Sequence, residues 1–163
     1  MNFKIILSVW VLGTFSACTT TTITKDQIKE TNKIVFHFHD KSVRPEYHRS
    51  YKIEITDHNS KCTVDSYGHV ISSKDTVVTP ALLSDLKLIL GSTKIENCEN
   101  SNDHGGCTGG TGESLILLNG GNVLFKDDIY YCGNHVYGKL CGTMLTKIKS
   151  KISCGAPFHF GQE

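Results

Sequence analysis

The stretch Ile34-Val35-Phe36-His37-Phe38-His39 has a large apolar side chain at every second position. This period of two is typical of a β-strand that turns one face to the core and the other to solvent. Residues 51–56 repeat the pattern, because Tyr51, Ile53 and Ile55 alternate with polar residues. Two neighbouring strands, each with one buried and one wet face, are therefore predicted.

The rest of the chain alternates between strand-like and helix-like segments. Thr79-Pro80 is typical of a helix start, and Gly91 of a helix end, so residues 79–91 are predicted to be a helix with one apolar stripe. A second helix is predicted over residues 143–152. Further strands are predicted at residues 62–67, 69–78, 94–98, 113–118 and 123–132. This order predicts an α+β fold, an antiparallel sheet with two helices packed on one face.

The N-terminus has the three parts of a secretory signal. Lys4 precedes an apolar run over residues 5–15, and the small residues Ser16 and Ala17 follow it. The run is shorter than the roughly 20 apolar residues that cross a bilayer. Residues 1–17 are therefore predicted to be a signal peptide.

The residues Phe15-Ser16-Ala17-Cys18 resemble the lipobox of bacterial lipoproteins, with Phe15 where an aliphatic residue is usual. The resemblance covers only the first eighteen residues. It implies cleavage before Cys18, a diacylglycerol on its sulfur, and anchoring in the cell envelope. Because Thr19 replaces the Asp that would retain such a protein, it also implies the outer membrane. Ordinary cleavage near Ser16 or Ala17 is the alternative.

The cysteine count agrees with lipidation, since seven cysteines minus Cys18 leave an even six. Small exported domains commonly use disulfides as staples. The preferred pairs are Cys98 with Cys107, Cys132 with Cys141, and Cys62 with Cys154. The Thr-rich residues 18–32 are predicted to be a flexible tether, and residues 33–163 one disulfide-stapled globular domain.

Charge argues against a nucleic-acid partner. The chain has 17 basic and 16 acidic residues, and loss of Lys4 with the signal leaves the two signs balanced. A nucleic-acid-binding surface needs a basic stripe. The expected partners are a membrane, through the lipid on Cys18, and a protein of unknown identity.

The loop over residues 99–112 is the predicted binding site. It is long and nearly free of apolar residues, and such loops are either functional or disordered. A Cys98–Cys107 bridge would order it and lower the entropy cost of association. The expected contacts are Asn102, Asp103 and His104 at the tip, with Gly105 and Gly106 allowing close approach of the backbone. A stabilising staple around a tolerated insertion is the alternative.

His37 and His39 point to a second candidate, a metal site completed by a histidine such as His48 or His58. The alternative is that both lie on the solvent face, opposite Ile34 and Phe36. No metal ligand is assigned and no cofactor is expected, because no further ligand has a recognisable spacing.

No coherent enzyme site is predicted. Ser114 is not in a nucleophile elbow, and Asp127 and Asp128 are adjacent on a strand, so they point to opposite faces. The leading hypothesis is a non-enzymatic envelope lipoprotein that binds a macromolecule, with hydrolase inhibition as one form of that role. A metal-binding protein is the second hypothesis and an enzyme with an unfamiliar site the third.

Overall fold

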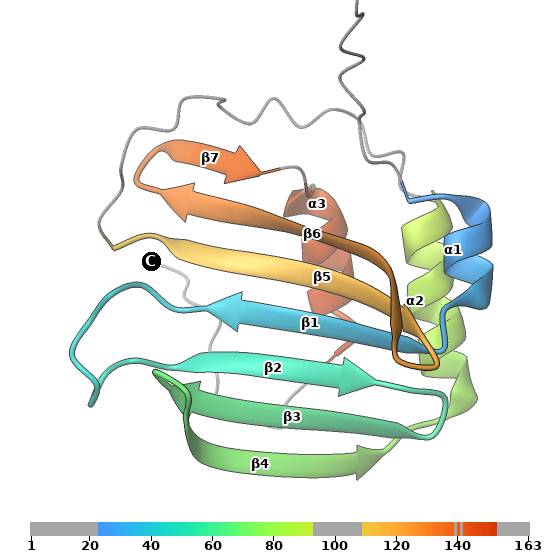
Figure 1. Cartoon of the computed structure of the whole chain (residues 1–163), viewed down its shortest axis with the longest axis horizontal. Coiled ribbons are helices and arrows are strands. Elements are labelled where there is room, and N and C mark those ends of the chain that lie inside the picture. Colours follow the sequence, from blue (N-terminus) through green and yellow to red (C-terminus); the bar gives the residue numbers. More distant parts are fainter. Residues whose placement is uncertain (1–22, 93–108, 139, 141, 153–163) are drawn as a thin grey trace, which may run out of the picture.

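β1 (Lys33–His39) lies at the centre of a seven-stranded sheet in the computed structural model, which describes residues 23–92, 109–138, 140 and 142–152. The strand order is β4-β3-β2-β1-β5-β6-β7 and every neighbouring pair is antiparallel (Figure 1). The other strands are β2 (Ser50–Ile55), β3 (Asn59–Ser66), β4 (His69–Val77), β5 (Thr111–Asn119), β6 (Asn122–Cys132) and β7 (His135–Gly138). The predicted α+β class is confirmed.

Alternation along β1 separates the two faces of the sheet. Phe36 is paired with Ile53 on β2 and with Leu115 on β5, and all three side chains are almost fully buried. Since directly opposite residues share a face, this side of the sheet carries the core, which we call the helix face. The other side, which we call the open face, carries the residues between them, such as His37, Lys52 and Ser114.

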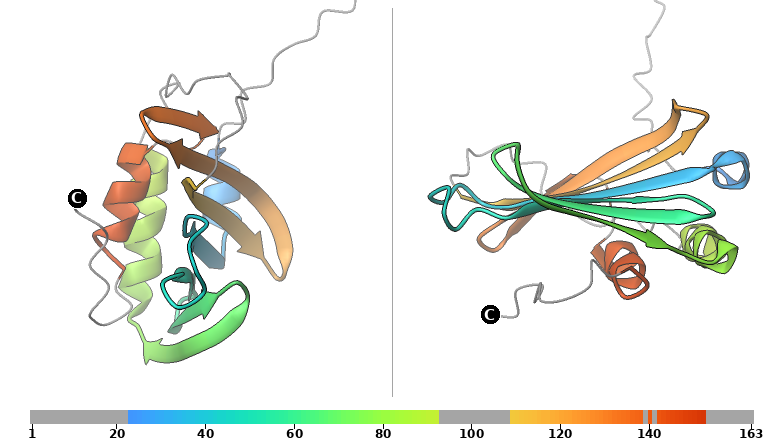
Figure 2. Two further views of the ribbon diagram at one scale, coloured as in Figure 1. Left: turned by 90° about the vertical axis from the view of Figure 1, so that its left-hand side faces the viewer. Right: turned by 90° about the horizontal axis from the view of Figure 1, so that it is seen from below.

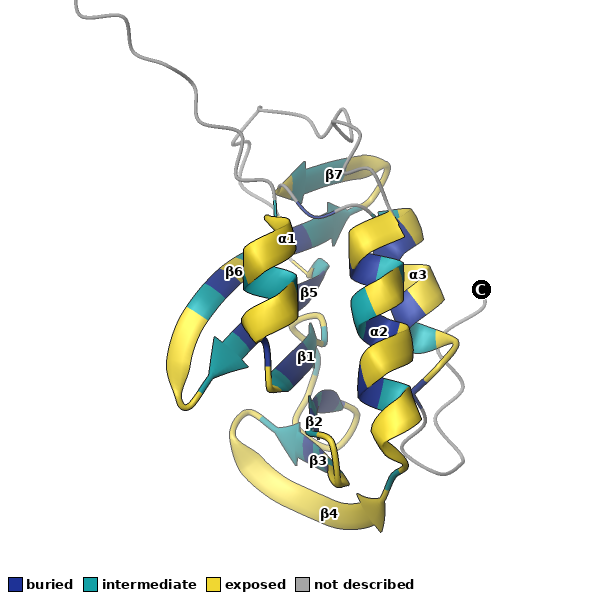
Figure 3. Cartoon of the chain, turned by 90° about the vertical axis from the view of Figure 1, so that its right-hand side faces the viewer, coloured by how far each residue is buried: buried dark blue, intermediate teal, exposed yellow. Residues whose placement is uncertain are grey.

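Two helices cover the helix face, as predicted. α2 (Pro80–Ser92) and α3 (Gly142–Lys149) lie side by side on the same side of the sheet (Figure 2). Each turns its buried residues toward the strands (Figure 3); these are Leu83, Leu86 and Leu90 on α2, and Met144, Leu145 and Ile148 on α3. Burying one such side chain is worth about 1.5–3 kcal/mol, so this layer is a main source of stability.

The tether predicted for residues 18–32 is wrong for its second half, because Lys25–Glu30 form a helix, α1. Thr24 and Gln27 form a capping box, in which each side chain accepts a hydrogen bond from the other residue's backbone N–H. Ile28 packs against the core, and the Gln27 amide donates to the Leu124 carbonyl at 2.6 Å. The ordered domain therefore begins before Lys33.

One further boundary and one further strand differ from the prediction. β5 starts at Thr111, so the last two residues of the predicted loop 99–112 belong to a strand. β7 was not predicted; it follows a turn with Gly133 in the left-handed region and extends the sheet by four residues. The predicted strand over residues 94–98 lies outside the described residues.

Candidate functional site

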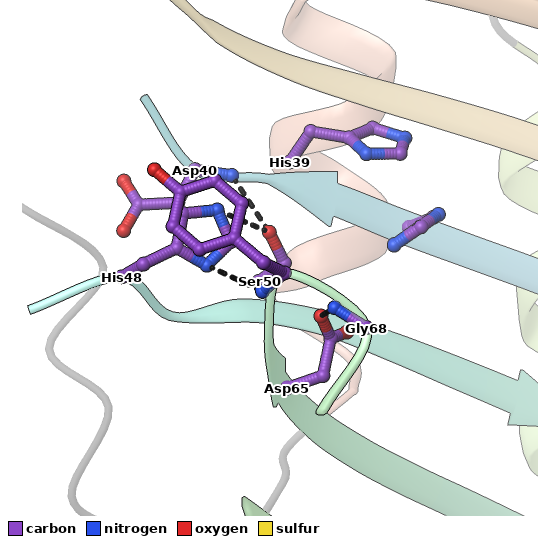
Figure 4. A pocket seen from close by; sticks show the side chains of 8 residues that line it. His39, Asp40, His48, Ser50, Asp65 and Gly68 are labelled. Carbon is purple, nitrogen blue, oxygen red and sulfur yellow. Dashed lines mark hydrogen bonds between the residues drawn. The ribbon is translucent and has the colours of Figure 1, made fainter. Parts of the chain in front are cut away.

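A pocket of about 350 Å³ opens at one end of the open face. It lies where β1 ends, β2 begins and β3 turns into β4, so three separate segments build its walls (Figure 4). Its lining residues are His37, His39, Asp40, His48, Ser50, Asp65, Tyr67 and Gly68. All but the glycine are polar or aromatic residues, which suits recognition by hydrogen bonds.

His37 and His39 project from β1 on the open face, opposite Ile34 and Phe36, as one of the two sequence interpretations predicts. Their ring centroids are 3.8 Å apart. His37 lies between Lys52 of β2 and Ser114 of β5. The i and i+2 positions of one strand thus bring two imidazoles into contact.

His48 and Ser50 are buried residues of the pocket lining, and this pair was not predicted from the sequence. The backbone N–H of Tyr67 donates to His48 Nδ1 at 3.3 Å, and His48 Nε2 lies 3.4 Å from Ser50 Oγ. The Tyr67 ring stacks on the imidazole with centroids 3.9 Å apart. Ser50 Oγ also accepts from the Asp40 N–H at 3.0 Å. The imidazole is therefore held by hydrogen bonds along its edge and by stacking on its face.

These contacts fix the tautomer of His48. A neutral imidazole has one donor and one acceptor nitrogen, and Nδ1 is the acceptor because it faces the N–H of Tyr67. Nε2 then carries the hydrogen and donates it to Ser50 Oγ. A general base needs an unprotonated nitrogen on the hydroxyl it activates. The pair therefore has its hydrogen on the wrong nitrogen for nucleophilic catalysis.

The connection from β1 to β2, residues 41–49, is locked in place from both ends. The Asp40 carboxylate accepts from the N–H groups of Lys41 and Arg49, at 2.8 and 2.9 Å. From the β3–β4 turn, Ser66 Oγ donates to the Pro45 carbonyl and the Tyr67 hydroxyl donates to the Val43 carbonyl. These hydrogen bonds hold the connection, which contributes His48 to the pocket, against the end of β3 and the β3–β4 turn.

Tyr67 holds this position at a backbone conformation uncommon for non-glycine residues. Its φ is +51°, in the left-handed region, and Gly68 follows at +84°. The Asp65 carboxylate accepts from the Gly68 N–H at 2.8 Å and closes the turn. A backbone conformation of this kind costs energy and persists only where surrounding contacts hold it. Here the contacts of Tyr67 with His48 and Val43 hold it.

The electrostatic environment keeps His37 neutral. Burial lowers the pKa of its imidazole, and the neighbouring His39 and Lys52 lower it further, while the Asp65 carboxylate acts in the opposite direction. Lys52 is itself 3.4 Å from Glu54, which also binds Lys33 at 2.6 Å. His37 therefore presents a neutral ring, able to donate or accept a hydrogen bond.

Of the two candidates for a third metal-ligating histidine, His48 lines the same pocket as His37 and His39, whereas His58 lies elsewhere. Both ring nitrogens of His48 are engaged, as described above. His58 lies in the β2–β3 turn and contacts Asp57 at 3.1 Å. Across the part of the chain that the structure describes, no group of three or more His, Cys, Asp or Glu side chains is arranged to hold a metal ion.

The predicted contact residues Asn102, Asp103, His104, Gly105 and Gly106 lie outside the described residues. The end of that loop is visible, however, and it enters the sheet beside the pocket. Gly112 pairs with His39 on one side and with Tyr130 on the other. A Cβ on Gly110 would lie 2.4 Å from the Tyr131 carbonyl oxygen, so the chain passes this point without a side chain.

Of the residues that were excluded as an enzyme site from the sequence, the adjacent Asp127 and Asp128 lie on opposite faces of the sheet. Asp127 pairs with Leu115 on the helix face, whereas Asp128 pairs with Ser114 on the open face, as adjacent strand positions require. Ser114 is buried beside His37 in the middle of the sheet, outside the pocket.

A buried ion pair on the helix face was not predicted. Lys149 Nζ lies 2.6 Å from Glu113 Oε1, and the Glu113 side chain is only 5% exposed. Within the described structure the second carboxylate oxygen, Oε2, has no hydrogen-bond partner. Glu113 occupies a position where the strand pattern calls for an apolar residue, and Lys149 on the last turn of α3 compensates its charge.

Of the six cysteines expected to pair, Cys62 and Cys132 lie among the described residues, and both are in disulfide bonds. Cys98, Cys107, Cys141 and Cys154 lie outside, as does Cys18. The individual pairings therefore remain predictions.

Compared with known protein families, curated proteins and solved structures, the chain shows no match. Within the described ranges, no helix has the length and apolar character needed to cross a membrane.

Proposed function

We propose that this chain is a non-enzymatic binding domain of the bacterial cell envelope that takes a protein partner on the open face of its sheet. The observation that carries the proposal is the preformed pocket at the end of that face. The connection that contributes His48 to the pocket, residues 41–49, is held by hydrogen bonds from Asp40, Ser66 and Tyr67. Pre-organised walls lower the entropy cost of association.

The composition of the open face supports a partner rather than a small apolar ligand. Around the pocket it presents imidazoles, the ammonium of Lys52 and the carboxylate of Glu54, all able to make hydrogen bonds. Among the described elements, α2 and α3 lie on the helix face and no helix lies over the open face (Figure 2). Rigid scaffolds of this kind commonly display binding residues at their edges and loops.

The absence of catalysis is part of the proposal and rests on the tautomer of His48. Among the described residues that line the pocket, Ser50 is the one serine, and His48 is the histidine beside its hydroxyl. Because Nδ1 of His48 accepts from Tyr67, its Nε2 cannot also accept the Ser50 proton. Inhibition of a hydrolase is one form of the binding role proposed here.

The envelope location rests on the N-terminal sequence, where Cys18 follows a signal-like segment. In this proposal a lipid on Cys18 holds the domain at the outer membrane, and residues 19–24 lie between that cysteine and α1. Disulfide bonds at Cys62 and Cys132 suit an oxidising compartment. A clickable fatty acid should label the wild-type protein and not Cys18→Ser; equal labelling of both would contradict the lipid anchor.

Site-specific photo-crosslinking in the native host tests the partner proposal. A photoreactive amino acid replaces Lys52 or Thr63 on the open face, and Leu88 on α2 is the matched control because its side chain is 70% exposed on the opposite layer. We expect one protein adduct from positions 52 and 63 and none from position 88. Adducts from position 88 alone would place the interface on the helices.

A further inference from the structure

Two imidazoles in the pocket have no part in its architecture. His48, Ser50, Asp40 and Asp65 all make hydrogen bonds that hold the walls together. Among the described residues, by contrast, the ring nitrogens of His37 and His39 make no hydrogen bond, and their contact is with each other. Two adjacent imidazole rings on one strand, with no hydrogen bond to another described residue, are a candidate pair of metal ligands.

The strand geometry suits a single metal ion. Residues i and i+2 of a strand are about 6.6–6.8 Å apart along it and point to the same face. The two ring centroids are 3.8 Å apart. Rotation of the two side chains so that one nitrogen of each points at a common ion would give two metal–imidazole bonds of roughly 2.0–2.1 Å. The rigid central strand fixes both side chains at their Cα atoms.

We propose that His37 and His39 together bind one divalent transition-metal ion of borderline softness at the mouth of the pocket. Imidazole nitrogen suits Cu²⁺, Ni²⁺ and Zn²⁺, whereas Mg²⁺ and Ca²⁺ prefer oxygen ligands. The described chain supplies no third preformed ligand, so water fills the remaining positions. The affinities follow the order in which Cu²⁺ binds more tightly than Ni²⁺ or Zn²⁺.

The surrounding charges allow a cation at this position. Asp40 and Asp65 both line the pocket. Lys52 opposes His37 across the β1–β2 ladder, but Glu54 contacts its ammonium at 3.4 Å and offsets part of that charge. This site is independent of the proposed protein partner, because it needs only β1 and bulk water.

Calorimetric titration of the purified protein, free of any histidine tag, tests the site. CuCl₂, NiCl₂, ZnCl₂ and MgCl₂ are each titrated into the wild type, His37→Ala, His39→Ala and His58→Ala at pH 7.5. His58 is the matched control, because it is an exposed histidine in the β2–β3 turn. Circular dichroism of each variant reports folding, and His39→Ala is the decisive variant because His39 is exposed on its strand.

The expected result is one Cu²⁺ per chain, weaker Ni²⁺ and Zn²⁺ binding, and no response to Mg²⁺. His37→Ala and His39→Ala should each weaken the Cu²⁺ affinity at least tenfold, while His58→Ala stays within about threefold of the wild type. Absence of wild-type binding, or equal affinities in the wild type and a folded His39→Ala, would overturn the proposal. Neither outcome bears on the protein partner, which the crosslinking experiment tests separately.

Discussion

The His48 side chain should stabilise the fold around the pocket, and its replacement measures its contribution to the free energy of unfolding. The imidazole is 6% exposed, stacks on Tyr67 and makes two hydrogen bonds. A stacked aromatic pair contributes about 0.5–1.5 kcal/mol, and each hydrogen bond about 1 kcal/mol. His48→Ala should therefore lower the free energy of unfolding by about 3 kcal/mol. His48→Phe keeps the ring and should lose only about 1–2 kcal/mol.

Urea denaturation at pH 7.5 gives both values, and nitrogen NMR of the imidazole gives the tautomer directly. We expect hydrogen on Nε2, as the Tyr67 N–H requires. Equal losses for the two variants would show that the stacking contributes nothing. Hydrogen on Nδ1 would refute the tautomer assignment and with it the argument against a catalytic Ser50.

Three further predictions concern stability. The hydrogen bond from Lys33 lowers the pKa of Glu54 below its usual 4.5. The ionised carboxylate therefore stabilises the fold above pH 4.5, and this stabilisation is lost as the pH falls through the folded pKa. In acid denaturation between about pH 5 and pH 3, Glu54→Gln should lose less stability than the wild type, by at most about 1 kcal/mol. Lys149→Met leaves the Glu113 carboxylate buried without its cation and should lower the free energy of unfolding, measured in urea, by about 3 kcal/mol. The control Lys147→Met, at an exposed position, should change this free energy little. Similar losses for both variants would argue against the ion pair. Gly110→Ala places a Cβ 2.4 Å from the Tyr131 carbonyl oxygen and should lower the melting temperature. Gly91→Ala in α2 places a Cβ 3.9 Å from Ile28 and should raise it, because alanine favours a helix more than glycine does. A higher melting temperature for both variants would show that the chain relaxes freely at Gly110.

The sheet was largely predictable from the sequence because its apolar residues alternate. β1 has apolar residues at Ile34, Phe36 and Phe38, and β2 has them at Tyr51, Ile53 and Ile55. This period of two predicts a strand with one buried face. α1 was missed because six residues in a Thr-rich segment carry little periodicity. Its signal was the capping box of Thr24 and Gln27. β7, with four residues, is too short for any pattern.

The candidate site was predictable only where its residues share one strand. The contact of His37 with His39 follows from their i and i+2 positions. His48 and Tyr67 are nineteen residues apart and meet only because the β3–β4 turn reaches over the connection from β1 to β2. That meeting depends on strand order and register, which one sequence without its fold does not specify.

The most direct test of the central claim is the affinity of the crosslinked partner for open-face variants. The partner identified from positions 52 and 63 is purified, and its Kd is measured for the wild type, the double variant Lys52→Ala with Thr63→Ala, and the control Leu88→Ala. We predict at least a tenfold loss for the open-face variant, equivalent to about 1.4 kcal/mol, and a change within threefold for the control. A wild-type Kd for the double variant, or a tenfold loss for Leu88→Ala, would contradict binding on the open face.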